Sequence, residues 1–161
     1  MDHWLWLLPA APHQTQLQEL IDRAAARFGG QPFLPHLTVG TFAERPRLAK
    51  LERSISRSPL HFSAKGVASA DHWSLAAYFI FATHPRLDAL RAKLPELRVR
   101  SGLPPHLSVW YGTAAPVRAE LLKLLHEFPL SGITFDRFAL VEAAPLEEPW
   151  RLVWQSERKL K

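Results

Sequence analysis

One pentapeptide occurs twice in this chain of 161 residues, and it constrains the possible folds more than any other feature. The first copy, PHLTV, spans 35–39, and the second, PHLSV, spans 105–109, 70 positions later. The same offset relates the Pro-Leu pair at 59–60 to the one at 129–130. Because one register holds over a strand and the helix after it, we expect an internal duplication.

Hydrophobic periodicity predicts the same order of elements in both halves. Short apolar, β-branched stretches alternate with stretches that carry leucines at helical spacing, with Gly and Pro between them. We expect strands at 3–9, 36–42, 60–71, 74–83, 106–112, 132–144 and 150–160, and helices at 13–30, 45–55, 86–94 and 116–128. The duplication then gives one bilobal domain over 1–161, with approximate repeats 1–70 and 71–161 about a pseudo-two-fold axis.

The composition narrows the functional classes. A net charge of +5 and a pI near 10 suit an anionic partner such as a phosphate ester or RNA. The chain has no cysteine, which excludes disulfides, thiolate catalysis and cysteine-bound zinc. Without a long apolar run or a basic leader, we expect a cytoplasmic protein with no membrane partner.

The repeated strand places the same chemistry twice in one cleft. Side chains two residues apart in a strand point to the same face, so His36 projects with Thr38 and His106 with Ser108. Two imidazoles can take up and release protons at opposite sides of a phosphodiester, and two hydroxyls can hold its non-bridging oxygens. We therefore expect these four residues to be catalytic, with no need for a metal.

The tripeptide His-x-Ser/Thr alone carries little information, because five of the eight histidines satisfy it. The other three instances begin at His13, His61 and His72. The two expected catalytic copies differ from these in their shared flanks and in their corresponding places in the two halves. No His-x3-His spacing and no carboxylate-rich cluster is present, so no metal site is expected.

On these residues the sequence resembles the two-histidine (2H) phosphoesterase superfamily, which is defined by two His-x-Thr/Ser motifs in duplicated lobes. The segments LWLLP, FGGQPFLPHLTVG and PHLSVWYG are most similar to its cyclic phosphodiesterase branch. The resemblance covers nearly the whole chain. It implies an α+β bilobal fold in which two antiparallel sheets face a central cleft and the helices lie outside.

The resemblance also implies roles for individual residues. It makes His106 the base that activates water and His36 the acid that protonates the leaving oxygen. Tyr111 matches a tyrosine near the substrate, yet regular strand alternation places Trp110 on the catalytic face instead. Either the strand bulges or Trp110 meets the ligand; Tyr111 could also cap the core at the strand end. The substrate-binding candidates are Tyr111, Trp110, Trp6 and Trp73, with core packing as the alternative for each tryptophan.

The expected function is metal-independent opening of a nucleotide-derived cyclic phosphate to a phosphomonoester. The substrate is either a nucleoside 2′,3′-cyclic phosphate or ADP-ribose 1″,2″-cyclic phosphate, and no cofactor is required. One alternative is an enzyme acting on the 3′ end of RNA, either opening 2′,3′-cyclic phosphates or joining ends like a 2′–5′ RNA ligase. Another is a nucleotide- or RNA-binding module without turnover. We expect a monomer. Arg45 and Arg47 follow the first motif strand and either face a phosphate group or are solvated at a helix start, and we favour the solvated position.

Overall fold

The computed structural model describes residues 2–55, 58–142 and 150–156, and the two halves repeat one order of elements. The first half contains β1 (His3–Pro9), α1 (His13–Phe28), β2 (Leu37–Phe42), α2 (Leu48–Ser54) and β3 (Leu60–Ala68). The second contains β4 (Ala77–Phe81), α3 (Pro85–Ala92), β5 (His106–Trp110), α4 (Arg118–His126) and β6 (Gly132–Glu142). A 3₁₀ helix, Trp73–Leu75, precedes β4, and β7 (Arg151–Gln155) closes the described chain. The ends expected for the last two strands, 143–144 and 157–160, lie outside the described residues.

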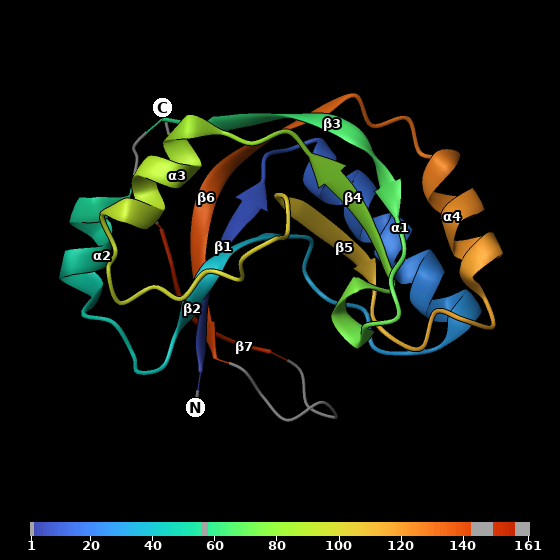
Figure 1. Cartoon of the computed structure of the whole chain (residues 1–161), viewed down its shortest axis with the longest axis horizontal. Helices are drawn as coiled ribbons and strands as arrows, with labels where there is room; N and C mark the ends of the chain where they lie inside the picture. Colours follow the sequence, from blue (N-terminus) through green and yellow to red (C-terminus); the bar gives the residue numbers. More distant parts are fainter. Residues whose placement is uncertain (1, 56–57, 143–149, 157–161) are drawn as a thin grey trace.

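The strands form one antiparallel arrangement in which the two halves exchange their third strands. The order is β2-β1-β6-β3-β4-β5, with β7 paired to β6. The first part of β3 pairs with β6 and the second part with β4, so the expected pair of sheets is joined through β3. Figure 1 shows the resulting arch, with β2 and β5 beneath it. The mixed α/β class, the antiparallel sheet and the four helices are as the sequence predicts.

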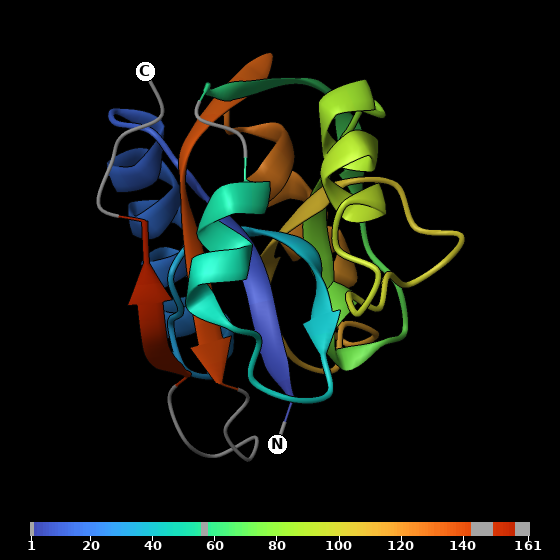
Figure 2. The same ribbon diagram turned by 90° about the vertical axis from the view of Figure 1, so that its left-hand side faces the viewer.

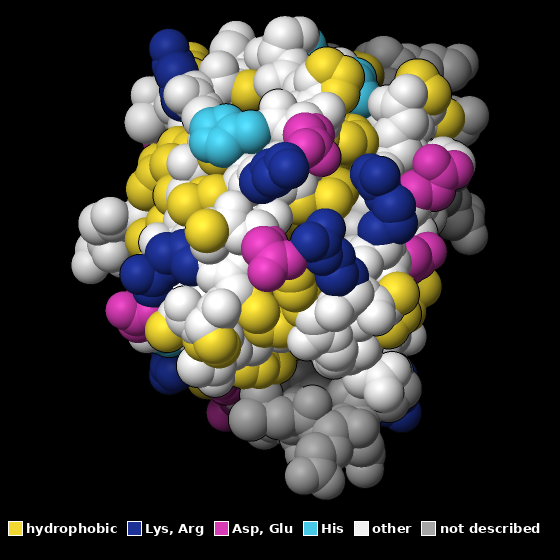
Figure 3. Space-filling model, turned by 90° about the vertical axis from the view of Figure 1, so that its right-hand side faces the viewer, with side chains coloured by type: hydrophobic (Ala, Val, Ile, Leu, Met, Phe, Trp, Pro, Cys, Tyr) yellow, Lys and Arg dark blue, Asp and Glu magenta, His cyan; other side chains and the backbone are white. Residues whose placement is uncertain are grey.

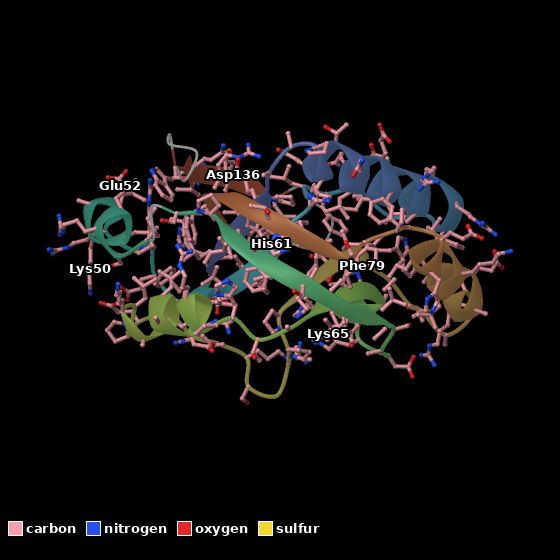
Figure 4. All side chains as sticks on the ribbon, turned by 90° about the horizontal axis from the view of Figure 1, so that it is seen from above. Lys50, Glu52, His61, Lys65, Phe79 and Asp136 are labelled. Carbon is pink, nitrogen blue, oxygen red and sulfur yellow. The ribbon has the colours of Figure 1, made fainter. Side chains whose placement is uncertain are left out.

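The helices lie in two pairs at opposite ends of the arch. Seen from above, α2 and α3 occupy one end, α1 and α4 the other, and β3 crosses between them (Figure 4). Each half contributes a helix that packs on a strand of the other half: α1 contacts β5, and α3 contacts β2. Figure 2 shows the end with α2 and α3 in front of the sheet. The first helix of each half therefore lies against the motif strand of the other half.

Helix α1 shows how the predicted periodicity produces this packing. Its predicted inner face is buried, with Leu17, Leu20 and Ile21 each at most 1% exposed. The helix stops at Gly29, whose φ of 82° is a backbone conformation that glycine adopts without steric cost. This helix, the longest described, has 16 residues, and no helix in the described ranges has both the length and the apolar character needed to span a bilayer.

Candidate active site

The fold brings the two repeated motifs to one cavity. β2 and β5 are the last strands at the two ends of the sheet order, and the arch makes them approach each other. A cavity of about 280 Å³ between them is lined by His36 and Thr38 from one half and by His106 and Ser108 from the other. Residues 70 positions apart in the sequence thus face the same space.

The motif strand of the first half contains a β-bulge. In the β1–β2 pair, Gly40 lies opposite Leu5 and Thr38 lies opposite Trp6, which leaves Val39 without a partner of its own. Such an extra residue bends the strand and reverses its regular alternation. Val39 is fully buried, so the strand bends around a core contact.

The second motif strand repeats the bulge at the equivalent valine. In the β4–β5 pair, Trp110 lies opposite Ala77 and Ser108 opposite Tyr78, so Val109 is the extra residue. The duplication thus extends to an irregularity of the backbone. The expectation from alternation that Trp110 shares the face of Ser108 is wrong, because the bulge lies between them. Trp110 is buried in the core instead.

Both candidate imidazoles are anchored in the same way. Nδ1 of His36 lies 2.6 Å from the carbonyl oxygen of Leu34, and Nδ1 of His106 lies 3.0 Å from that of Pro104. A carbonyl oxygen only accepts hydrogen bonds, so Nδ1 carries the hydrogen in each ring. The neutral rings therefore hold their lone pair on Nε2, the nitrogen that remains free for proton transfer.

An aromatic ring from the neighbouring strand supports each imidazole. Trp6 stacks on His36 with ring centroids 3.6 Å apart and planes 11° apart. Tyr78 meets His106 edge-on, with centroids 5.5 Å apart. Trp6 and Tyr78 occupy equivalent places, opposite the hydroxyl residue of each motif. These contacts hold the ring orientations that the Nδ1 hydrogen bonds select.

The two hydroxyls differ in their availability. Ser108 donates a hydrogen bond of 2.8 Å to the carbonyl oxygen of Ser74. Thr38 lines the cavity, and its hydroxyl has no hydrogen-bond partner among the described residues. Thr38 can therefore donate to a bound anion without breaking an existing bond, whereas Ser108 must first rotate.

The two histidines differ in how strongly burial lowers their pKa. Desolvation lowers the pKa of His36 to about 4, against the opposing hydrogen bond to Leu34 and with a further lowering by nearby His106. The pKa of His106 is also lowered, chiefly by burial, with Pro104 opposing the shift and Arg100 adding to it. His36 is 5% exposed and His106 is only half-buried, so the effect is larger on His36. His36 is thus neutral at pH 7.

Tyr111 reaches the cavity because of the bulge. Its hydroxyl lies 3.4 Å from Nε2 of His36. Its ring stacks on Phe33 at a centroid distance of 4.1 Å, and Trp73 packs against it at 4.7 Å. Burial raises the pKa of Tyr111 above its ordinary value, against a hydrogen bond with Ser108, so the phenol keeps its proton and can donate a hydrogen bond to Nε2 of the neutral His36.

The three candidate tryptophans lie around this cavity without lining it. Trp6 packs under His36, and Trp73, which is 40% exposed, lies beside Tyr111. Trp110 packs in the core, where its indole N–H donates a hydrogen bond of 2.7 Å to the carbonyl oxygen of Gly29. Of the four aromatic residues expected at the substrate, Tyr111 alone lines the cavity.

Three arginines line the cavity, and the motif analysis missed all of them: Arg91, Arg98 and Arg100. Nε of Arg91 donates a hydrogen bond of 3.0 Å to the carbonyl oxygen of Val39, the bulged residue. Nη1 of Arg91 lies 3.8 Å from Oδ1 of Asp88. Burial lowers the pKa of Arg91 and Asp88 raises it. A guanidinium from α3 is therefore held against the motif strand of the other half.

The position of Arg91 in the leucine pattern of α3 is a sequence signal that it meets a buried partner. Leu87, Leu90 and Leu94 form a stripe at helical spacing, and all three are buried. Position 91 belongs to that stripe, since it lies four residues after Leu87. A cation at such a position must either escape to solvent or meet a buried partner, and here the partner is a backbone carbonyl.

The described residues hold no group of three histidine or carboxylate side chains arranged to bind a metal ion. The cavity lining instead combines two imidazoles, a phenol, three guanidinium groups and four hydroxyls, two of them from the motifs, with the single carboxylate of Asp2. This set can move protons and hold an anion, which are the two requirements for hydrolysis of a phosphate ester.

No family model matches the sequence, and no curated protein is similar to it. Solved structures, among them a phosphoesterase and LigT, are similar in fold over 96% of this chain. The mixed α/β fold with an antiparallel sheet and four helices, which the resemblance implied, is thus confirmed for the described residues.

Particular structures show the extent of the likeness. TT0787 of Thermus thermophilus has a TM-score of 0.58 at 16% identity, covering 96% of both chains. A structure described as a phosphoesterase gives 0.57 at 14% identity, again over 96% of both chains. LigT of E. coli, complexed with 3′-AMP, gives 0.55 at 11% identity over 96% of each chain. At these identities the likeness establishes the fold, and the activity must be argued from the site.

Proposed function

We propose that this chain is a cyclic phosphodiesterase that opens a nucleotide-derived 2′,3′- or 1″,2″-cyclic phosphate without a metal ion. One observation carries the proposal: two imidazoles, each anchored through Nδ1 to the carbonyl two residues earlier, line one cavity. Two independently oriented proton-transfer groups serve a reaction that needs both a base and an acid. Simple binding of an anion needs neither.

The burial of the histidines supports an assignment of their roles that reverses the one implied by the resemblance. His36, neutral and with its lone pair on Nε2, is the base that takes a proton from the attacking water, which must replace the Tyr111 hydroxyl as the hydrogen-bond partner of Nε2. His106, whose pKa is lowered less, is the acid that protonates the leaving ribose oxygen. The new bond joins the water oxygen to phosphorus, the bond to the ribose oxygen breaks, and solvent resets both protonation states.

Arg91 and Thr38 are suited to hold the non-bridging oxygens while this exchange takes place. The Arg91 guanidinium is fixed through Nε, and its Nη1 lies 3.8 Å from Oδ1 of Asp88, which leaves Nη2 for the anion. The Thr38 hydroxyl is free to donate. Donors positioned before the reaction stabilise charge that builds up in the transition state, because they need not reorganise.

Product analysis by phosphorus NMR in the presence of EDTA tests the function. The substrates are adenosine 2′,3′-cyclic phosphate, ADP-ribose 1″,2″-cyclic phosphate and a short RNA that ends in a 2′,3′-cyclic phosphate. We expect a phosphomonoester whose position identifies the leaving oxygen. Loss of turnover with EDTA would contradict the metal-free mechanism, and no turnover of any substrate would favour the binding module.

A second candidate, an enzyme acting on RNA 3′ ends, is favoured by the arginines of the cavity. The cavity lining carries three guanidinium groups, those of Arg91, Arg98 and Arg100, against the one carboxylate of Asp2, and this net positive charge exceeds what one cyclic phosphate requires. Among structures of this fold, LigT of E. coli has been solved with 3′-AMP and with ATP, which supports a nucleotide-derived ligand. A preference for the RNA substrate, or the joining of RNA ends in the reverse direction, would select this candidate.

The assigned roles predict an acidic pH optimum. The base must be deprotonated, so kcat/KM rises with pH through the pKa of His36, about 4. The acid must be protonated, so kcat/KM falls as pH passes the pKa of His106, which lies below its ordinary 6.5. A cyclic phosphodiester does not titrate here, so we expect a maximum between pH 4 and pH 6.5.

Initial rates at low substrate concentration across a pH range of about 3.5 to 8.5 give this profile, with His61→Ala as the control. His61 lies on β3, away from the cavity lining, and the variant should keep the wild-type profile. A maximum above about pH 7 would overturn the assignment of His36 as the base.

A further inference from the structure

A second, larger cavity adjoins the proposed active site. It has a volume of about 550 Å³ and is lined by residues 42–47 after β2, by Lys50 and Leu51 of α2, and by Leu94, Glu96 and Arg98. Arg98 lines both cavities. The walls are also continuous along the chain, because 38–41 line the first cavity and 42–47 line the second. The two cavities therefore meet at Arg98 and at the end of β2.

The junction between the two cavities is built by the backbone. The amide of Thr41 donates to the carbonyl oxygen of Arg98 at 2.9 Å, and the amide of Arg98 donates back at 2.7 Å. Gly40 permits this approach, since a Cβ there would lie 2.7 Å from the carbonyl oxygen of Arg98. Figure 1 shows the connection that precedes β5 passing beside β2. The backbone of Arg98 is thus fixed at the boundary between the cavities, and the residue lines both.

The larger cavity has the composition of an anion site and lacks that of a reaction centre. It contains no histidine, hydroxyl or phenol side chain. It carries four cations, Arg45, Arg47, Lys50 and Arg98, against the carboxylates Glu44 and Glu96. Lys50 pairs with Glu96, and Figure 4 shows Lys50 projecting from α2 at this end of the molecule.

Three of the four cations in this cavity are unpaired among the described residues. Within the described ranges, the side chains of Arg45, Arg47 and Arg98 form no ion pair or hydrogen bond. At the opposite end, Lys and Arg are interspersed with Asp and Glu (Figure 3), and Arg27 pairs with Glu120 across α1 and α4. The sequence led us to expect Arg45 and Arg47 to be solvated at a helix start. They are exposed, and both face this cavity.

We propose that this cavity binds a second phosphate group of the same substrate, held by Arg45, Arg47 and Arg98 while the cyclic phosphate lies between the two histidines. The inference rests on the proposed function. Two sources supply such a group: a phosphodiester of an RNA chain that ends in the cyclic phosphate, and the pyrophosphate of a dinucleotide. Guanidinium groups suit both, because each binds phosphate oxygens through paired N–H donors.

Steady-state kinetics at low salt, with kcat and KM separated, test this proposal. Adenosine 2′,3′-cyclic phosphate has no second phosphate, a trinucleotide RNA with a terminal 2′,3′-cyclic phosphate carries phosphodiesters, and ADP-ribose 1″,2″-cyclic phosphate carries a pyrophosphate. The variant is R45Q/R47Q, and the matched control is Arg53→Gln, an exposed arginine on α2 outside the cavity lining.

We expect R45Q/R47Q to raise KM about tenfold for at least one substrate with a second phosphate, since charge-assisted hydrogen bonds to phosphate are lost. Its kcat on every substrate and its KM for adenosine 2′,3′-cyclic phosphate should stay within about twofold, because no proposed catalytic residue changes. A rise for the RNA alone identifies the chain phosphodiester, and a rise for the ADP-ribose compound alone identifies the pyrophosphate. Unchanged KM for both, or an equal rise for all three substrates, would overturn the second phosphate site.

A binding experiment separates this proposal from the proposed function. Fluorescence anisotropy measures the affinity of a labelled trinucleotide with a 3′-phosphate and, in competition, of ADP-ribose 1″-phosphate, neither of which carries a cyclic phosphate to open. R45Q/R47Q should raise the Kd of at least one of them about tenfold, and Arg53→Gln should leave both unchanged. This result would stand even if the wild type opened no cyclic phosphate. Equal affinities in wild type and double variant for both probes would contradict the site.

Discussion

His106→Ala should lower kcat for cyclic phosphate opening by about a thousandfold or more, and His36→Ala should do the same. General acid and general base catalysis are each typically worth about a hundred- to ten-thousandfold, and each variant removes one of the two. The double variant should lose little more than the worse single one, since both residues act in one step. The measurement is kcat on adenosine 2′,3′-cyclic phosphate, together with Tm for each variant.

His61→Ala is the control that matches this prediction. His61 begins the same His-x-Ser tripeptide, but it lies on β3, where its Nδ1 is 3.0 Å from the Thr134 hydroxyl (Figure 4). We expect its kcat to stay within about twofold of wild type. His106→Ala is the more informative catalytic variant, because His106 is less buried than His36 and its loss leaves the Trp6 stack intact. Turnover near the wild-type rate in a folded His106→Ala variant would exclude the two-histidine mechanism.

Arg91→Gln should lower kcat by about a hundredfold. Removing one preorganised donor to a developing negative charge costs about 10² to 10³ in kcat in well-studied enzymes, and Arg91 is fixed by its bond to Val39. Arg91→Lys should fall between Arg91→Gln and the wild type, because it keeps the charge and loses the paired donors.

The split between kcat and stability distinguishes this role from a structural one. If Arg91 served only to bind the bulge carbonyl, Arg91→Gln would lower Tm while the folded enzyme kept its kcat. Arg53→Gln, an exposed arginine outside the cavity lining, is the matched control and should change neither quantity. A normal kcat for Arg91→Gln would remove Arg91 from the mechanism.

Local patterns in the sequence were sufficient for the element order and the motif residues. The inner face of α1 follows from leucines at helical spacing, and the buried Leu17, Leu20 and Ile21 confirm it. The exchange of third strands between the halves could not be predicted from such patterns. Both β3 and β6 have equally good strand sequences, and which partner each one chooses depends on contacts between distant segments.

The face of Trp110 illustrates the limit of a periodic argument. Alternation is reliable only while every residue has a partner across the ladder, and Val109 has none. One extra residue therefore turned Trp110 into the core and Tyr111 into the cavity. The sequence already posed this alternative, but nothing local to PHLSVWYG could decide it.

The sequence by itself was enough to predict an internal duplication and to single out His36, Thr38, His106 and Ser108 as candidate catalytic residues, because a repeated motif is visible without coordinates. Only the tertiary structure decided which imidazole has the more strongly lowered pKa and which arginines line the cavity. The physical reason is that burial and electrostatic fields are sums over neighbours in space. Those neighbours come from both halves of the chain.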